Sequence, residues 1–131
     1  MALVTGWIAV VLIALAAALP LGFRWKAGRR AAPASPLMKA HVAIGLATSV
    51  IGFLHTATLV ADLGAPGAVA GGAIALAPGA FAFFVLVAHT GIGLQLRDER
   101  LKDRPRKRRL HRLTASLIVI GVAAHVLALR L

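Results

Sequence analysis

Four long apolar segments constrain this chain more than any other feature of its sequence. They cover about residues 3–23, 37–61, 72–96 and 109–129 of a 131-residue chain that is 60% hydrophobic. As a helix, about 20 apolar residues cross the ~30 Å hydrocarbon core of a bilayer. A soluble domain of this size does not need so much apolar surface. The sequence therefore predicts one all-α domain, residues 1–131, forming an integral membrane four-helix bundle.

The arrangement of the basic residues predicts how the bundle is oriented. Lysine and arginine occur in the loop after the first segment (Arg24, Lys26, Arg29, Arg30), at Lys39, and in the loop before the fourth (Arg97, Arg100, Lys102, Arg104, Arg106, Lys107, Arg108, Arg109). The stretch between the second and third segments has none. Because cytoplasmic loops are rich in lysine and arginine, we expect both termini outside and both basic loops in the cytoplasm. We expect the bacterial inner (cytoplasmic) membrane, with the first segment retained as an uncleaved span because its charges follow it.

Composition excludes several classes of function. The formal charge of +11 would suggest nucleic-acid binding in a soluble protein, but these charges lie in short loops, so we expect no nucleic-acid partner. Residues 104–109, RPRKRR, either act only as topology determinants or also contact anionic lipids or an acidic partner subunit. The chain has no cysteine, which excludes disulfides, thiolate metal sites, iron–sulfur clusters and thioether-attached haem.

Histidines recur at one spacing in two of the apolar segments. HVAIGLATSVIGFLH (41–55) and HRLTASLIVIGVAAH (111–125) each begin and end with histidine and enclose thirteen residues. An α-helix turns about 100° per residue, so the second histidine returns to within about 40° of the first, roughly 21 Å along the axis. Each pair therefore lies on one helix face, with one ring near each membrane surface.

The second and fourth segments run in the same direction, because one span separates them. His41 then shares an inner level with His111, and His55 an outer level with His125. Two facing imidazoles at one level supply the two axial ligands of a six-coordinate haem. The pattern predicts two haems stacked across the bilayer.

Glycines and basic residues flank the histidines. We expect three glycines within about a turn of a histidine to leave room for a flat macrocycle: Gly45, Gly52 and Gly121. Four basic residues near the two levels are candidates to pair with haem propionates or, equally, to act as interfacial anchors: Lys39, Arg109, Arg112 and Arg130.

The paired H-x13-H pattern resembles the dihaem core of membrane b-type cytochromes. It is similar to the cytochrome b of quinol-oxidising bc complexes and to the transmembrane domain of ferric reductases and NADPH oxidases. The resemblance covers residues 37–131 and rests on the stretches 41–55 and 111–125. It implies that His41, His55, His111 and His125 are axial ligands of two haem b groups that carry electrons across the membrane.

The resemblance leaves the electron donor and acceptor open. It is compatible with a membrane quinone or with an extracytoplasmic metal or protein acceptor. The sequence contains neither the later helices that build quinone pockets in the bc cytochrome nor a flavin or nicotinamide domain. We therefore expect a subunit of a larger redox complex, or a homodimer, rather than a stand-alone enzyme.

Two other functions remain open. The histidines could line a transport path for protons or a metal ion, although the spans hold no carboxylate to act as a partner. A purely structural subunit would leave five histidines unexplained. His89, in the third segment, is outside the four-ligand scheme and has three candidate roles: hydrogen-bonding a propionate or lining a quinone site, replacing His111 as ligand, or packing as a hydrogen-bonded histidine.

Overall fold

The computed structural model describes residues 1–63, 73–98 and 100–129. The chain is all-helical, with α1 (Ala2–Ala27), α2 (Pro36–Asp62), a 3₁₀ turn η1 (Ala73–Leu76), α3 (Ala77–Gln95) and α4 (Arg104–Ala128). Four segments, 2–27, 36–61, 74–95 and 104–128, are each long and apolar enough to cross a membrane. The all-α fold with four helices of spanning length is confirmed.

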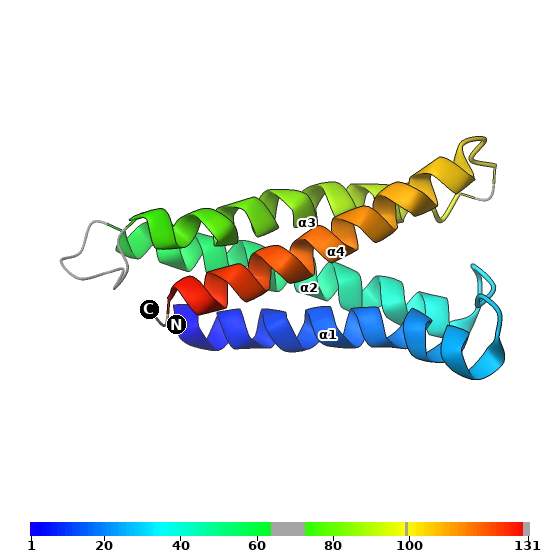
Figure 1. Ribbon diagram of the computed structural model, residues 1–131, viewed down its shortest axis with the longest axis horizontal. Helices are drawn as coiled ribbons and strands as arrows, with labels where there is room; N and C mark the ends of the chain where they lie inside the picture. The colour runs from blue at the N-terminus through cyan, green and yellow to red at the C-terminus, as the bar shows by residue number, and fades with distance from the viewer. Residues whose placement is uncertain (64–72, 99, 130–131) are drawn as a thin grey trace.

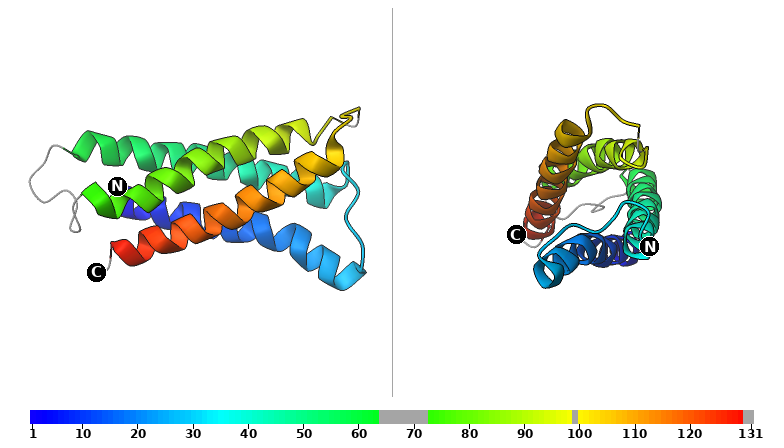
Figure 2. Two further views of the ribbon diagram at one scale, coloured as in Figure 1. Left: turned by 45° about the horizontal axis from the view of Figure 1, so that its top comes forward. Right: turned by 90° about the vertical axis from the view of Figure 1, so that its right-hand side faces the viewer.

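The helices form two antiparallel hairpins that lie side by side. α1 runs along α2 and α3 along α4, while α2 packs against α3 (Figure 1). Viewed along the bundle, the four helices follow one another in chain order, and α1 touches α4 far less than its own hairpin partner (Figure 2). The start of α1 and the end of α4 lie at the same end of the molecule, as an even number of antiparallel passes requires.

Local chemistry sets the ends of the first two helices. Gly28 adopts φ 63°, in the left-handed region that a side chain disfavours, and its N–H donates to the carbonyl of Arg24 at 3.0 Å. Ser35 precedes α2, and its hydroxyl accepts a 3.4 Å hydrogen bond from the N–H of Met38. Pro36 occupies the first helical turn, where its missing N–H costs nothing.

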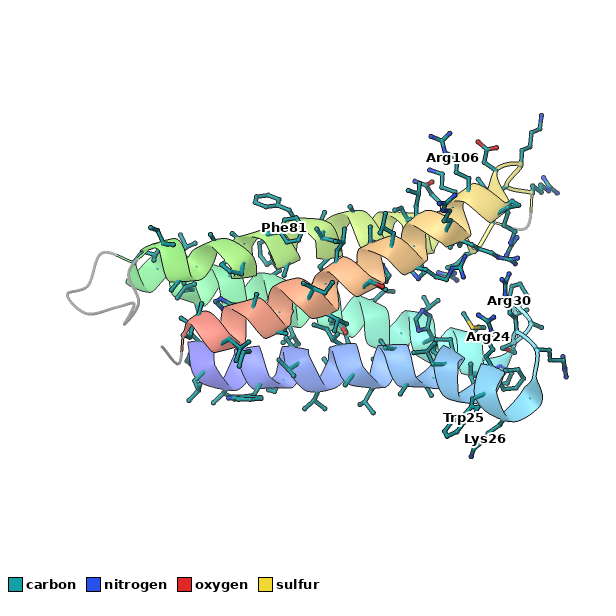
Figure 3. The ribbon with its side chains drawn as sticks, viewed as in Figure 1. Arg24, Trp25, Lys26, Arg30, Phe81 and Arg106 are labelled. Atoms are coloured by element: carbon teal, nitrogen blue, oxygen red, sulfur yellow. The ribbon has the colours of Figure 1, made fainter. Side chains whose placement is uncertain are left out.

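The fourth helix begins at Arg104, earlier than the residue 109 that its apolar pattern predicts. The stretch 104–109 is thus helical and carries basic side chains at the end of the bundle that also holds Arg24, Lys26 and Arg30 (Figure 3). Arg104 turns back to the end of α3, where its guanidinium donates to the carbonyls of Leu96 at 2.9 Å and Asp98 at 3.1 Å. The bond to Leu96 satisfies a carbonyl at the C-terminal end of α3.

Little of the described chain is fully enclosed. The most buried side chains are small or medium-sized, with exposed fractions of 7% or less: Thr48, Ala75, Ala82 and Ile118. The hydroxyls of Ser49 on α2 and Thr90 on α3 share a 2.7 Å hydrogen bond where the two hairpins meet. Large apolar side chains such as Phe84 face outward. A polar bond between helices and an apolar exterior are both typical of helices that pack within a bilayer.

Candidate functional site: two histidine pairs

The structure brings together the histidines that the sequence pairs. The ring centroids of His41 and His111 lie 6.2 Å apart, with their planes at 84°. Those of His55 and His125 lie 6.4 Å apart, with their planes at 70°. Each pair joins α2 to α4, so each hairpin supplies one ring to each level.

The two separations fit one metal ion between each pair of rings. An imidazole nitrogen binds a first-row metal ion at about 2.0–2.1 Å and lies roughly 1.1 Å from its ring centroid, so two rings on opposite sides of one ion have centroids about 6.3 Å apart. A direct hydrogen bond of about 2.9 Å would draw the centroids to roughly 5 Å. The described pairs are wider than that, and no hydrogen bond joins their rings.

Backbone carbonyls orient three of the four rings. The Nδ1 of His41 lies 2.8 Å from the carbonyl of Ala16, that of His55 2.9 Å from the carbonyl of Ala2, and that of His125 3.4 Å from the carbonyl of Ala75. A carbonyl can only accept, so each Nδ1 carries the hydrogen and donates it. The Nε2 of each ring then keeps its lone pair, which is the state of a metal-binding histidine.

Two prolines leave such carbonyls with fewer partners. In an α-helix the N–H of residue 20 would donate to the carbonyl of Ala16, but residue 20 is a proline inside α1 and has no N–H. In the 3₁₀ pattern the N–H of residue 78 would donate to Ala75, and residue 78 is also proline. The carbonyls that receive His41 and His125 therefore face less competition from the backbone. Pro20 was not among the residues predicted from the sequence, although a proline inside an apolar segment is visible there.

Glycines on the neighbouring helices make room for three of the rings. A Cβ on Gly79 would lie 2.8 Å from Nδ1 of His125, and a Cβ on Gly93 would lie 3.2 Å from Cε1 of His111. On α1, a Cβ on Gly6 would lie 3.1 Å from Cε1 of His55. These glycines were not among the predicted site residues, although Gly79 and Gly93 repeat the fourteen-residue spacing of the histidines.

The three glycines predicted from the sequence, Gly45, Gly52 and Gly121, do not face the histidine rings. A Cβ on Gly52 would meet Leu86, and one on Gly121 would meet Ala82, so both allow close approach to α3. Gly45 has no such neighbour within 4 Å. None of the three has a histidine ring among its near neighbours, because each lies on the same helix as its histidine, whereas the rings point toward other helices.

Two of the most buried residues lie midway between the levels. Thr48 and Ile118 each follow one histidine by seven residues and precede the next by seven. Seven residues are close to two helical turns, so each lies on the histidine face of its helix. Their side chains therefore fill the bundle between the inner and the outer pair.

His89 lies at the inner level, against His111. The two rings stack with centroids 3.8 Å apart and planes at 15°. The Nδ1 of His89 is 2.8 Å from the hydroxyl of Thr114, which itself lies 3.0 Å from the carbonyls of Leu110 and His111. Of the three candidate roles, these contacts favour a packed, hydrogen-bonded histidine.

The basic candidates have exposed side chains. Lys39, Arg109 and Arg112 all face outward in the described structure, and Arg130 lies outside the described residues. Exposure is compatible both with anchoring at a membrane interface and with pairing to a propionate at the bundle edge.

Beyond the paired rings, the described residues hold no group of three or more histidine, cysteine or carboxylate side chains that could bind a metal ion. No family model, curated protein or solved structure matches this chain.

Gly79→Ala should displace the His125 ring, because the added methyl would overlap it. We expect the imidazole nitrogen resonances of His125, assigned by comparison with a His125 variant, to move, and stability to fall by about 1–3 kcal/mol from overpacking. Gly91→Ala on the same helix is the matched control, since its Cβ would meet nothing within 4 Å. Unmoved His125 resonances in Gly79→Ala would contradict the contact.

Pro20→Ala should strengthen α1 and weaken the orientation of His41. The new N–H would bond the Ala16 carbonyl in competition with Nδ1 of His41, while loss of an interior proline would stabilise the helix by up to about 3 kcal/mol. Nitrogen NMR of the His41 ring should then show less of the Nδ1–H tautomer. Pro33→Ala, outside the helices, should leave both properties unchanged, and an unaltered tautomer in Pro20→Ala would disprove the role of Pro20.

Proposed function

We propose that this protein carries electrons across a membrane through two haem b groups, one held by His41 and His111 and the other by His55 and His125. The observation that supports this most strongly is the separation of the paired rings, 6.2 and 6.4 Å, which leaves room for one metal ion at each level. The likeness to b-type cytochromes supports the choice of haem as the group that brings this ion.

The haem iron would supply one-electron chemistry, since it is reduced and reoxidised without bond rearrangement. The residues of the chain would hold the haem groups, orient the ligand rings and exclude water. His41 with His111 would hold one haem and His55 with His125 the other, and two histidine ligands for each iron would favour electron transfer over substrate chemistry. The carbonyls bonded to Nδ1 fix the rings and raise their basicity. Thr48 and Ile118 would occupy the space between the two haems and keep water from it.

The membrane orientation is inferred from charge. We propose that the four helices span the cytoplasmic membrane of a bacterium with both termini outside. The basic end of the bundle, which includes Arg24, Lys26, Arg30 and Arg106 (Figure 3), would face the cytoplasm. There it would contact anionic lipid headgroups.

The partners are proposed by chemical class. We propose that the protein acts beside other membrane redox subunits or as a homodimer, with a quinone or an extracytoplasmic metal or protein at one end of the path. It would thus serve an oxidoreductase as its electron-transfer subunit.

Haem content tests the proposal directly. A dithionite-reduced minus oxidised spectrum, with haem measured as its pyridine complex, should give two b-type haems per chain. His55→Ala and His125→Ala should each retain only the inner haem, and His41→Ala only the outer one, because a bis-histidine site fails when either ligand is lost. Ser116→Ala, whose hydroxyl bonds only the carbonyl of Arg112 in the described structure, is a control that should keep both.

Two results would contradict the proposal. Protein produced with ample haem that binds none would favour the histidine-lined transport path, which proton or metal-ion flux into liposomes would then test. Retention of both haems in His55→Ala and in His125→Ala would show that the ligand pairs are assigned wrongly.

Cysteine labelling tests the orientation. The chain has no cysteine, so a single new one reports its own side of the membrane. A membrane-impermeant maleimide added to intact cells should label Ala65→Cys and not Arg30→Cys, since positive loops remain inside. Opening the cells should make Arg30→Cys reactive. The reverse labelling would place the basic end outside and refute the orientation.

A further inference from the structure

The two ligands of the inner level are held in different ways. Nδ1 of His41 donates to the carbonyl of Ala16 at 2.8 Å, whereas the buried Nδ1 of His111 has no hydrogen-bond partner within the part of the chain that the structure describes. A metal-binding histidine almost always donates its second nitrogen to such a partner, which fixes the plane of the ring. His111 is therefore the one ligand candidate without this support among the described residues.

A second imidazole ring packs against one face of His111. His89 lies face to face with His111, with centroids 3.8 Å apart and planes 15° from parallel. One turn after His89 on α3, a Cβ at Gly93 would come within 3.2 Å of Cε1 of His111. The ring of His111 is thus confined by the face of His89 and by the backbone of α3.

The ring of His89 is in turn held in place. Its Nδ1 is 2.8 Å from the hydroxyl of Thr114. That hydroxyl lies 3.0 Å from two carbonyls, of Leu110 and His111, which can only accept. The hydroxyl hydrogen is thus directed to a carbonyl, and its oxygen accepts from His89. Thr114 comes one turn after Leu110 on the helix that carries His111, so one short stretch of α4 holds both the ligand and the anchor of the ring stacked on it.

We propose that His89 is a positioning residue, which holds His111 in its ligating orientation by stacking in place of an Nδ1 hydrogen bond. This rests on the proposed function, since it assigns His111 to the inner haem. His89 would touch the ligand and not the iron. The inner haem would then depend on His89 to keep its sixth ligand, while the outer haem would not.

Carbon monoxide is a suitable probe, because it binds reduced haem only when an axial ligand leaves. The parent protein, with two six-coordinate haems, should bind little. His89→Ala should keep both haems and raise the apparent affinity for carbon monoxide by about 10–100-fold, because losing a residue that supports a metal ligand typically weakens metal binding by that factor. The spectral change should involve about half of the haem, and His125→Ala, which keeps only the inner haem, should show it again when combined with His89→Ala.

Two further variants separate stacking from other roles of His89. His89→Phe keeps an aromatic face and cannot bind iron, so it should restore resistance to carbon monoxide. Thr114→Val removes the anchor of His89 at nearly constant shape and should give an intermediate affinity. Ser116→Ala, on the same helix, should behave as the parent.

The outcomes decide between the two proposals. Two haems in His89→Ala with no gain in carbon monoxide binding would overturn the role of His89 and leave the proposed function intact. Loss of one haem in both His89→Ala and His89→Phe would make His89 itself a ligand, and would also overturn it. A parent protein without haem would overturn the proposed function and this inference together.

Discussion

Three of the four paired histidines are oriented by hydrogen bonds from imidazole nitrogens to backbone carbonyls of other helices. Carbonyls inside an α-helix already have a partner, so a side chain in an apolar helix finds few acceptors. Pro20 reduces that competition at Ala16, and Pro78 does so at Ala75, and these two carbonyls receive His41 and His125. A proline inside a helix is normally a cost. Here it supplies the acceptor that orients a ring.

The same dependence makes the two levels unequal. At the outer level both rings have a carbonyl partner, although the 3.4 Å contact of His125 is longer than the 2.9 Å contact of His55. At the inner level only His41 has one within the described residues, and His111 is confined by the stacked ring of His89. Ligand basicity and ring orientation both affect the potential of a bound haem. Under the proposed function, two haems with the same kind of ligands would therefore differ in potential.

Much of this arrangement could be predicted from local patterns. Apolar length predicted the four helices, and the fourteen-residue spacing placed two rings on one face of α2 and two on one face of α4. The start of α4 could not be predicted, because the stretch RPRKRR is as compatible with a loop as with a helix. The contact that favours the helix is the hydrogen bond from Arg104 to the carbonyl of Leu96 at the end of α3. The predicted glycines were chosen by position along the histidine's own helix, which says nothing of the group that each one faces.

The sequence alone determined the features that depend on geometry within one helix: which histidines share a face of the helix and how far apart they lie along it. Tertiary structure decided which groups of the other helices meet the rings, namely the carbonyl of Ala16, the backbone at Gly79 and the ring of His89. The reason is physical. Spacing within a helix is set by its own hydrogen bonds, whereas contacts between helices depend on how antiparallel neighbours slide and rotate against each other, which only packing settles.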